Sequence, residues 1–167
     1  MNESIEKVKP SDIDCIKQIE IQSALSSWSK ADYLSEIDRT DSLFYLARGD
    51  KDILGFILAR LIMEDTYDSK PTSNISNNTE IEIYNIAVKK QFRRSMIGSR
   101  LLDKISSRAQ EILAEKIFLE ARKSNFGAIA FYKKHGFEVT GTRKNFYTNP
   151  PEDAILMTRH IELLQNP

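Results

Sequence analysis

The sequence predicts a single domain of the α/β (α+β) class over residues 1–167. Hydrophobic residues recur with helical spacing in some segments and with strand spacing in others, and the two kinds of segment alternate along the chain. A chain of 167 residues with 41% apolar content is long enough for one full hydrophobic core and leaves little room for a second domain.

Residues 4–10 predict a short strand, and the segment that follows predicts a helix. Ser11 with Asp14 can form a capping box at the start of this helix, because each side-chain oxygen can accept a backbone N–H that has no helical partner. The apolar stripe of the helix consists of Ile13, Ile16 and Ile19. Cys15 lies beside this stripe, so we expect it to pack in the core rather than to act as a nucleophile.

A second helix is expected to begin with the capping pair Ser29 and Asp32. Its apolar positions are Tyr33, Leu34 and Ile37. Residues 42–62 then predict a β-hairpin that turns at Gly49 and Asp50. Residues 64–79 are polar, rich in Ser and Asn, and have no period, which predicts an exposed loop.

The second half of the chain alternates more regularly between the two spacings. We expect strands over residues 80–88, 116–122, 137–142 and 154–161, and helices over residues 95–114 and 126–135. Gly136 follows the second of these helices at the position where glycine commonly adopts a left-handed conformation.

Charge and cysteine content disfavour several functional classes. The 24 Lys and Arg residues balance 24 Asp and Glu, so a nucleic-acid partner held by net charge alone is not expected. The single cysteine excludes an internal disulfide, and two distant histidines indicate neither a metal site nor a catalytic triad. The sequence shows no signal peptide and no apolar run of 18 residues, so we expect a cytoplasmic protein without a membrane partner.

The stretch NIAVKKQFRRSMIGSRLL, residues 85–102, places a cluster of cations where a predicted strand turns into a predicted helix. The cations are Lys89, Lys90, Arg93 and Arg94. The first backbone N–H groups of a helix lack helical partners and lie at the positive end of its dipole, so this corner can bind an anion such as a phosphate. The alternative is a solvated basic turn without a ligand.

Three segments carry a family resemblance: residues 85–102, FLEARKSNFGAIAFYKKHGF and GTRKNFYTNPPEDAILM. They resemble consecutive blocks of the Gcn5-related N-acetyltransferases, and within that family the bacterial ribosomal-protein-alanine N-acetyltransferases. The resemblance covers most of residues 28–157. It implies a mixed, mostly antiparallel sheet of about six or seven strands, flanked by about four helices, with splayed middle strands that hold acetyl-coenzyme A and no metal.

The family's pyrophosphate loop, Q/R-x-x-G-x-G/A, falls on residues 93–98 and places Met96 where the family has glycine. We expect this substitution to be tolerated, because a backbone N–H can donate from a helical conformation that methionine adopts. By resemblance the pantetheine arm lies along the strand that ends at Val88, whose N–H would face the thioester oxygen. Asn125 would contact the same arm, and it can also cap the helix that follows. The implied cofactor-binding residues are Ile86, Ala87, Val88, Arg93, Arg94, Ser95, Met96, Ile97, Gly98, Ser99 and Asn125.

The resemblance also implies the catalytic pair, with Glu120 as general base and Tyr132 as general acid. Glu120 follows three apolar residues at the end of a predicted strand, which places it at the edge of the core. The alternatives are an ordinary strand-end carboxylate paired with Arg122 and a tyrosine that only packs at the edge of the core.

Trp28, Phe146 and Tyr147 match family positions beside the acceptor, although Trp28 can equally be a packing anchor. The resemblance thus implies an N-terminal protein acetyltransferase that acts directly on the α-amine, with alanine of a ribosomal protein as acceptor. Acetylation of a lysine or of a small-molecule amine is the first alternative. A coenzyme-sensing or nucleic-acid-binding module is the alternative of a different class, which the presence of both Glu120 and Tyr132 disfavours.

Overall fold

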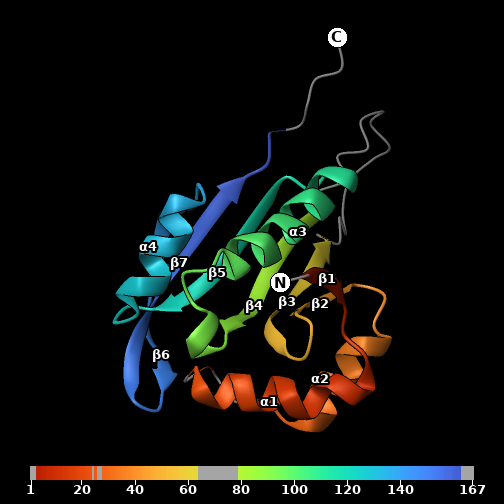
Figure 1. The fold of residues 1–167 in the computed structure, drawn as a ribbon. Helices are drawn as coiled ribbons and strands as arrows, with labels where there is room; N and C mark the ends of the chain where they lie inside the picture. The colour runs from red at the N-terminus through yellow and green to blue at the C-terminus, as the bar shows by residue number, and fades with distance from the viewer. Residues whose placement is uncertain (1–2, 24, 26–27, 64–78, 163–167) are drawn as a thin grey trace. The chain divides into compact units, whose positions relative to one another are not determined.

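The computed structural model describes residues 3–23, 25, 28–63 and 79–162 (Figure 1). In these parts of the chain, seven strands form one mixed sheet in the order β1-β2-β3-β4-β5-β7-β6 and are accompanied by four α-helices, which confirms the predicted fold class. The predicted loop over residues 64–79 lies outside the described residues except for Thr79, which begins a strand. The elements are β1 (Ser4–Lys7), η1 (Pro10–Asp12), α1 (Ile13–Gln22), α2 (Lys30–Asp38), β2 (Ser42–Arg48), β3 (Ile53–Met63), β4 (Thr79–Val88), η2 (Lys90–Phe92), α3 (Ile97–Glu111), β5 (Lys116–Arg122), α4 (Phe126–Lys134), β6 (Glu138–Thr148) and β7 (Pro151–His160).

The chain divides into two compact units. The first unit comprises residues 1–60 and 83–107, and the second comprises residues 61–82 and 108–167. None of the described helices is both long enough and apolar enough to span a membrane.

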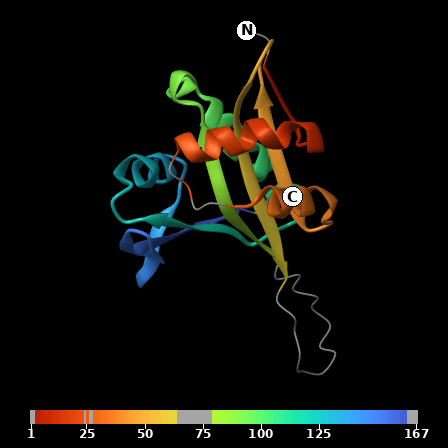
Figure 2. The ribbon, with the colours of Figure 1, turned by 90° about the horizontal axis from the view of Figure 1, so that it is seen from below.

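In the first unit, β1, β2 and β3 pair antiparallel, and α1 lies across the strands (Figure 2). The predicted stripe of α1 is confirmed, because Ile13, Ile16 and Ile19 are buried against Phe44, Leu46, Phe56 and Leu58 of the hairpin. Cys15 packs at the rim of this cluster, as expected. Tyr45 points away from the cluster, since the ammonium of Lys104 in α3 lies 5.5 Å from the centre of its ring. Both faces of β2 are therefore covered, which explains why its five central residues are all buried.

The predicted start of α1 is wrong, whereas that of α2 is confirmed. Pro10 opens a 3₁₀ turn before α1, and the carboxylate of Asp12, not that of Asp14, accepts the Lys9 N–H at 2.9 Å. At α2, the Ser29 hydroxyl accepts the Asp32 N–H at 3.0 Å, and the Asp32 carboxylate accepts the Ser29 N–H at 2.7 Å. Of the three apolar residues expected on this helix, Tyr33 is buried and Ile37 packs against the core, but Leu34 is exposed.

The second unit contains β5, α4 and the antiparallel strands β6 and β7, with α4 beside β5 and β7 in Figure 1. Alternate residues of β5 are buried, which is the pattern predicted for a strand with one face in a core. The buried apolar side chains include Ile117, Leu119, Tyr132, Phe137 and Met157. Gly136 ends α4 with φ of 81°, as predicted, and a Cβ there would meet the Arg159 side chain at 3.2 Å. The last two strands are longer than predicted because β6 keeps pairing with β7 as far as Thr148 and Pro151.

Candidate functional site

The segment between β4 and α3 forms an irregular turn in the first unit. Arg94 and Met96 both adopt left-handed conformations, with φ of 65° and 68°. The expectation that Met96 adopts an ordinary helical conformation is therefore wrong, since this is the region that favours glycine. Left-handed residues in such turns direct neighbouring backbone N–H groups into a concavity that suits an anion.

The helix that follows adds donors to this turn. The N–H of Arg100 donates to the Met96 carbonyl at 3.0 Å, which is a regular helical bond. The N–H groups of Ile97 and Gly98 precede that bond and belong to the first turn of α3, at the positive end of a helix of 15 residues. The predicted cofactor residues 93–99 thus form this turn and the start of the helix that follows it.

The four cations at this corner do not act alike. Lys89 forms an ion pair with Asp52, and its side chain is only 14% exposed, so its charge is already matched. The guanidinium of Arg93 donates from Nε to the Val88 carbonyl at 3.1 Å and from Nη2 to the Ser23 hydroxyl at 3.3 Å. Arg93, Lys90 and Arg94 are all exposed. The corner is therefore a turn with three exposed cations, of which Arg93 is bonded to its surroundings, rather than a uniform cluster of four.

The end of β4 is held closely against β3. A Cβ on Gly55 would lie 2.5 Å from the Ala87 carbonyl oxygen, so only glycine fits this backbone approach. The Lys89 N–H donates to the Leu54 carbonyl at 2.8 Å, which continues the attachment past the end of the strand. Ala87 is buried, and Ile86 and Val88 are half-buried. The predicted pantetheine strand is thus rigidly placed in the first unit.

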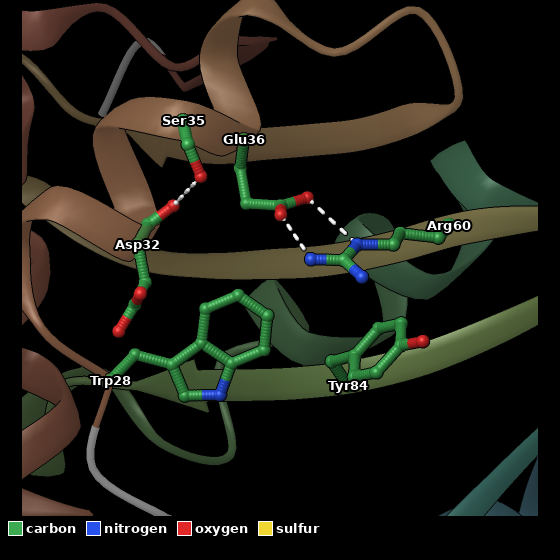
Figure 3. A pocket seen from close by; sticks show the side chains of 6 residues that line it. All are labelled: Trp28, Asp32, Ser35, Glu36, Arg60 and Tyr84. Carbon is green, nitrogen blue, oxygen red and sulfur yellow. Dashed lines mark hydrogen bonds and ion pairs between the residues drawn. The ribbon is translucent and has the colours of Figure 1, made fainter.

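Trp28 lines a pocket of about 390 Å³ in the first unit (Figure 3). The guanidinium of Arg60 lies 5.6 Å from the ring centre of Trp28 and 4.9 Å from that of Tyr84, and its Nε and Nη2 donate to the two oxygens of the Glu36 carboxylate. The six residues that line the pocket are Trp28, Asp32, Ser35, Glu36, Arg60 and Tyr84. Trp28 is also a packing anchor, because its ring stacks on Tyr33 at 5.6 Å, so both expected roles are compatible with its position.

A buried carboxylate fixes the backbone of Trp28. Glu20, whose side chain is 1% exposed, accepts the Trp28 N–H at 2.9 Å and the Tyr33 hydroxyl at 2.8 Å, and it forms an ion pair with Lys17. Asn85 donates in turn to the Tyr33 oxygen at 3.3 Å. Burial, followed by the hydrogen bond to Glu20, raises the pKa of Tyr33. This network gave no local sequence signal, because its members come from two helices, a connecting segment and a strand.

In the second unit, Glu120 lies on the half-exposed face of β5 with 18% of its side chain exposed. Its carboxylate forms an ion pair with Arg143 of β6 at 2.6 Å. The alternative in which Glu120 pairs with Arg122 is wrong, because Arg122 forms its ion pair with Glu152 at 3.3 Å and stacks on Tyr147. Arg143 was missed in the sequence, although it stands three residues before the aromatic pair expected at the acceptor.

Tyr132 is buried in the second unit on α4. Its ring lies 5.4 Å from that of Phe131 and 5.6 Å from that of Phe137. Burial raises the pKa of Tyr132, with a smaller contribution from Tyr147, so the phenol is protonated at neutral pH. A general acid needs this protonation state.

The remaining predicted residues of the second unit lie on α4 and β6. The Asn125 side chain accepts the Ala128 N–H at 3.1 Å, so its predicted capping role is confirmed, while its predicted cofactor contact stays a prediction. Phe146 and Tyr147 contact each other edge to face at 5.0 Å, and Phe146 is 39% exposed. The hydroxyl of Tyr147 approaches the backbone oxygen of Glu120 at 3.5 Å. Glu120 and the aromatic pair are therefore neighbours.

Comparisons with known proteins find relatives along most of the chain. A family model described as the acetyltransferase (GNAT) family matches residues 13–137. A Bacillus subtilis protein provisionally assigned as a ribosomal protein bS18-alanine N-acetyltransferase is 30% identical over 155 residues, which is 92% of this chain and 93% of that protein. An N-alpha-acetyltransferase of Sulfurisphaera tokodaii is 27% identical over 154 residues, covering 92% of this chain and 90% of its own length.

Solved structures show the same fold over nearly the whole chain. The crystal structure of Ard1 from Thermoplasma volcanium matches with a TM-score of 0.80 and 28% identity, covering 96% of this chain and 99% of that one. The ribosomal-protein-S18-alanine N-acetyltransferase of Escherichia coli matches with a TM-score of 0.79 and 24% identity, covering 99% of both chains.

Proposed function

Because the chain belongs to the acetyltransferase (GNAT) family and is an acyltransferase, we propose that it transfers acetyl from acetyl-coenzyme A to the α-amine of a protein N-terminus. We take alanine of a ribosomal protein as the first acceptor to test, which would make the reaction a cytoplasmic one. The bacterial relatives that match almost end to end are named ribosomal protein bS18-alanine N-acetyltransferases, the archaeal ones are named N-alpha-acetyltransferases, and this observation carries the proposal.

The turn over residues 93–99 supports the choice of acetyl-coenzyme A. Its left-handed residues and the first N–H groups of α3 offer donors for the pyrophosphate, and the exposed Arg94 supplies positive charge. We assign the pantetheine arm to Ile86, Ala87 and Val88 of β4 and to Asn125, with the Val88 N–H as the donor to the thioester oxygen.

In the reaction that we propose, the amine nitrogen of the acceptor bonds to the thioester carbonyl carbon, and the carbon–sulfur bond breaks. Glu120 takes the proton that the nitrogen loses, and Tyr132 gives its proton to the departing thiolate. Coenzyme A and an acetylated chain are the products, and no acyl-enzyme is formed. Trp28, Phe146 and Tyr147 would contact the acceptor chain.

Proton affinity favours an α-amine over a lysine as the acceptor. An α-ammonium has a pKa of about 7.7–8.0 and a lysine ammonium one of about 10.4, so at neutral pH roughly a tenth of the α-amines is uncharged but well under a thousandth of the lysines. The difference corresponds to about 3 kcal/mol. A single carboxylate base such as Glu120 therefore needs less assistance at a chain terminus.

The test uses two peptides of the same sequence, which begins with alanine and contains lysine. One peptide has an unmodified N-terminus, and the other carries a blocked α-amine. We expect acetylation of the first on its terminal nitrogen and no transfer to the second. Comparable rates on both peptides would show that the acceptor is lysine rather than the α-amine. Failure of the protein to bind acetyl-coenzyme A would refute the proposed reaction altogether.

A further inference from the structure

The ion pair between Glu120 and Arg143 reaches across a strand of the second unit. Glu120 of β5 pairs with Leu156 of β7, and Arg143 of β6 pairs with Ala154, two residues away on the same strand. Side chains two residues apart on a strand lie on one face, so Glu120 and Arg143 share a face with β7 between them. The pair therefore depends on the register of three strands.

A bulge in β6 places an aromatic ring against the guanidinium. The register shifts between Arg143 and Tyr147, and within this bulge Asn145 adopts a left-handed conformation with φ of 52°, which Asn tolerates better than most residues. The Asn145 N–H donates to Asp153 at 3.0 Å, which anchors the bulge to β7. The ring centre of Phe146 consequently lies 4.3 Å from the Arg143 guanidinium carbon.

The arrangement fixes a side chain that would otherwise be mobile. The Arg143 side chain is 57% exposed, whereas the Glu120 side chain is 18% exposed, so the arginine is the more solvent-exposed member of the pair. An exposed ion pair contributes only roughly 0–1 kcal/mol to stability. A gain of this size does not account for the bulge, its anchor on β7 and the ring stacked on the guanidinium, which together hold the arginine in place.

We propose that Arg143 is a positioning residue of the acetyl transfer, which orients the Glu120 carboxylate toward the acceptor amine while Phe146 supports the guanidinium. This inference rests on the proposed function, in which Glu120 is the general base. One carboxylate oxygen, Oε1, is held by Arg143 at 2.6 Å. Oε2 is the oxygen that we assign to the acceptor proton, and a carboxylate fixed in this way keeps it in one direction.

The test measures kcat and KM with an alanine-starting peptide for Arg143→Ala, Arg143→Lys and the neighbouring control Lys144→Ala, which removes a charge from the same strand. We expect Arg143→Ala to lower kcat about 10-fold with the KM for acetyl-coenzyme A nearly unchanged, because orientation affects the reacting geometry rather than cofactor binding. Arg143→Lys should recover most of the loss, and Lys144→Ala should retain the wild-type kcat.

A double-mutant cycle separates this inference from the proposed function. In the Glu120→Gln background, Arg143→Ala should change kcat less than about 2-fold, because Arg143 acts through Glu120. An equal loss in both backgrounds, or an unchanged kcat for Arg143→Ala while Glu120→Gln is inactive, would overturn the positioning role alone. Full activity of Glu120→Gln would show that Glu120 is not the general base. If Arg143→Ala does not fold, Arg143→Gln keeps the aliphatic stem and serves in the same cycle.

Discussion

Glu20 in the first unit and Glu120 in the second are both largely shielded glutamates, yet their surroundings differ in kind. Glu20 is 1% exposed and is surrounded by Lys17, the Trp28 N–H and the Tyr33 hydroxyl. Glu120 is 18% exposed and is held by an arginine that is itself more than half exposed. A carboxylate whose oxygens are all engaged in a dry network stabilises the fold, whereas one with an accessible oxygen can exchange a proton.

The largest effect should come from removing the carboxylate of the second unit. We expect Glu120→Gln to lower kcat by about 10²-fold or more with little change in the melting temperature, because the amide keeps the shape but accepts no proton at neutral pH. Steady-state kinetics and thermal unfolding on the same preparation check both halves. A normal kcat would show that the proton leaves by another route.

The matched substitution in the first unit should have the opposite profile. Glu20→Gln leaves the ammonium of Lys17, whose side chain is 17% exposed, without its counter-charge, so we expect it to lower the free energy of unfolding by about 3 kcal/mol. The folded fraction should keep most of the wild-type kcat. Urea unfolding gives the first quantity, and kinetics scaled to the folded fraction give the second. A loss of kcat comparable to that of Glu120→Gln would abolish the distinction between the two glutamates.

Alkaline pH should lower the stability of the fold through Tyr33, which belongs to the buried network around Glu20. The pKa of Tyr33 is raised in the folded state, mainly by burial, so above pH about 10 the unfolded chain loses the phenol proton while the folded chain keeps it. The unfolded state then binds fewer protons, and the free energy of unfolding falls by up to about 1.4 kcal/mol per pH unit for this group. Tyr33→Phe should make that fall shallower, as measured by urea unfolding between pH 8 and 11. An unchanged slope would contradict the prediction.

The smallest effect should come from Met96, which lies outside both carboxylate environments. Its left-handed backbone disfavours a residue with a Cβ, so Met96→Gly should stabilise the fold by about 1 kcal/mol or less and keep the affinity for acetyl-coenzyme A or improve it modestly. Thermal unfolding and cofactor titration check the two expectations. A large loss of affinity would show that the methionine side chain itself contacts the cofactor.

Local signals allowed much of the fold to be predicted. The strand over residues 116–122 and the capping box of Ser29 with Asp32 appear as expected, since both depend on neighbours in the sequence. The predicted cap of α1 is wrong because Pro10 starts a 3₁₀ turn before the helix. The carboxylate of Asp12 in this turn accepts a backbone N–H, a role that the sequence pattern gave to Asp14.

The parts that could not be predicted depend on contacts between distant residues. Arg143 and Glu120 are 23 residues apart, and they meet because a bulge sets the register of β6 on β7. The Arg60 stack on Trp28 and Tyr84 likewise joins β3, β4 and the segment before α2. The resemblance predicts which residues take part in the chemistry, whereas the partners of these residues follow from the register of three strands, which a bulge in β6 shifts.

We propose the α-amine of a protein chain as the acceptor. The most direct test is mass spectrometry of all proteins from cells with and without the gene, scored for acetylation of N-termini and of lysines. We predict that acetyl groups disappear from one or a few N-terminal alanines, first among ribosomal proteins, while lysine acetylation is unchanged. Unchanged N-termini together with lost lysine acetylation would contradict the assignment of the α-amine as the acceptor.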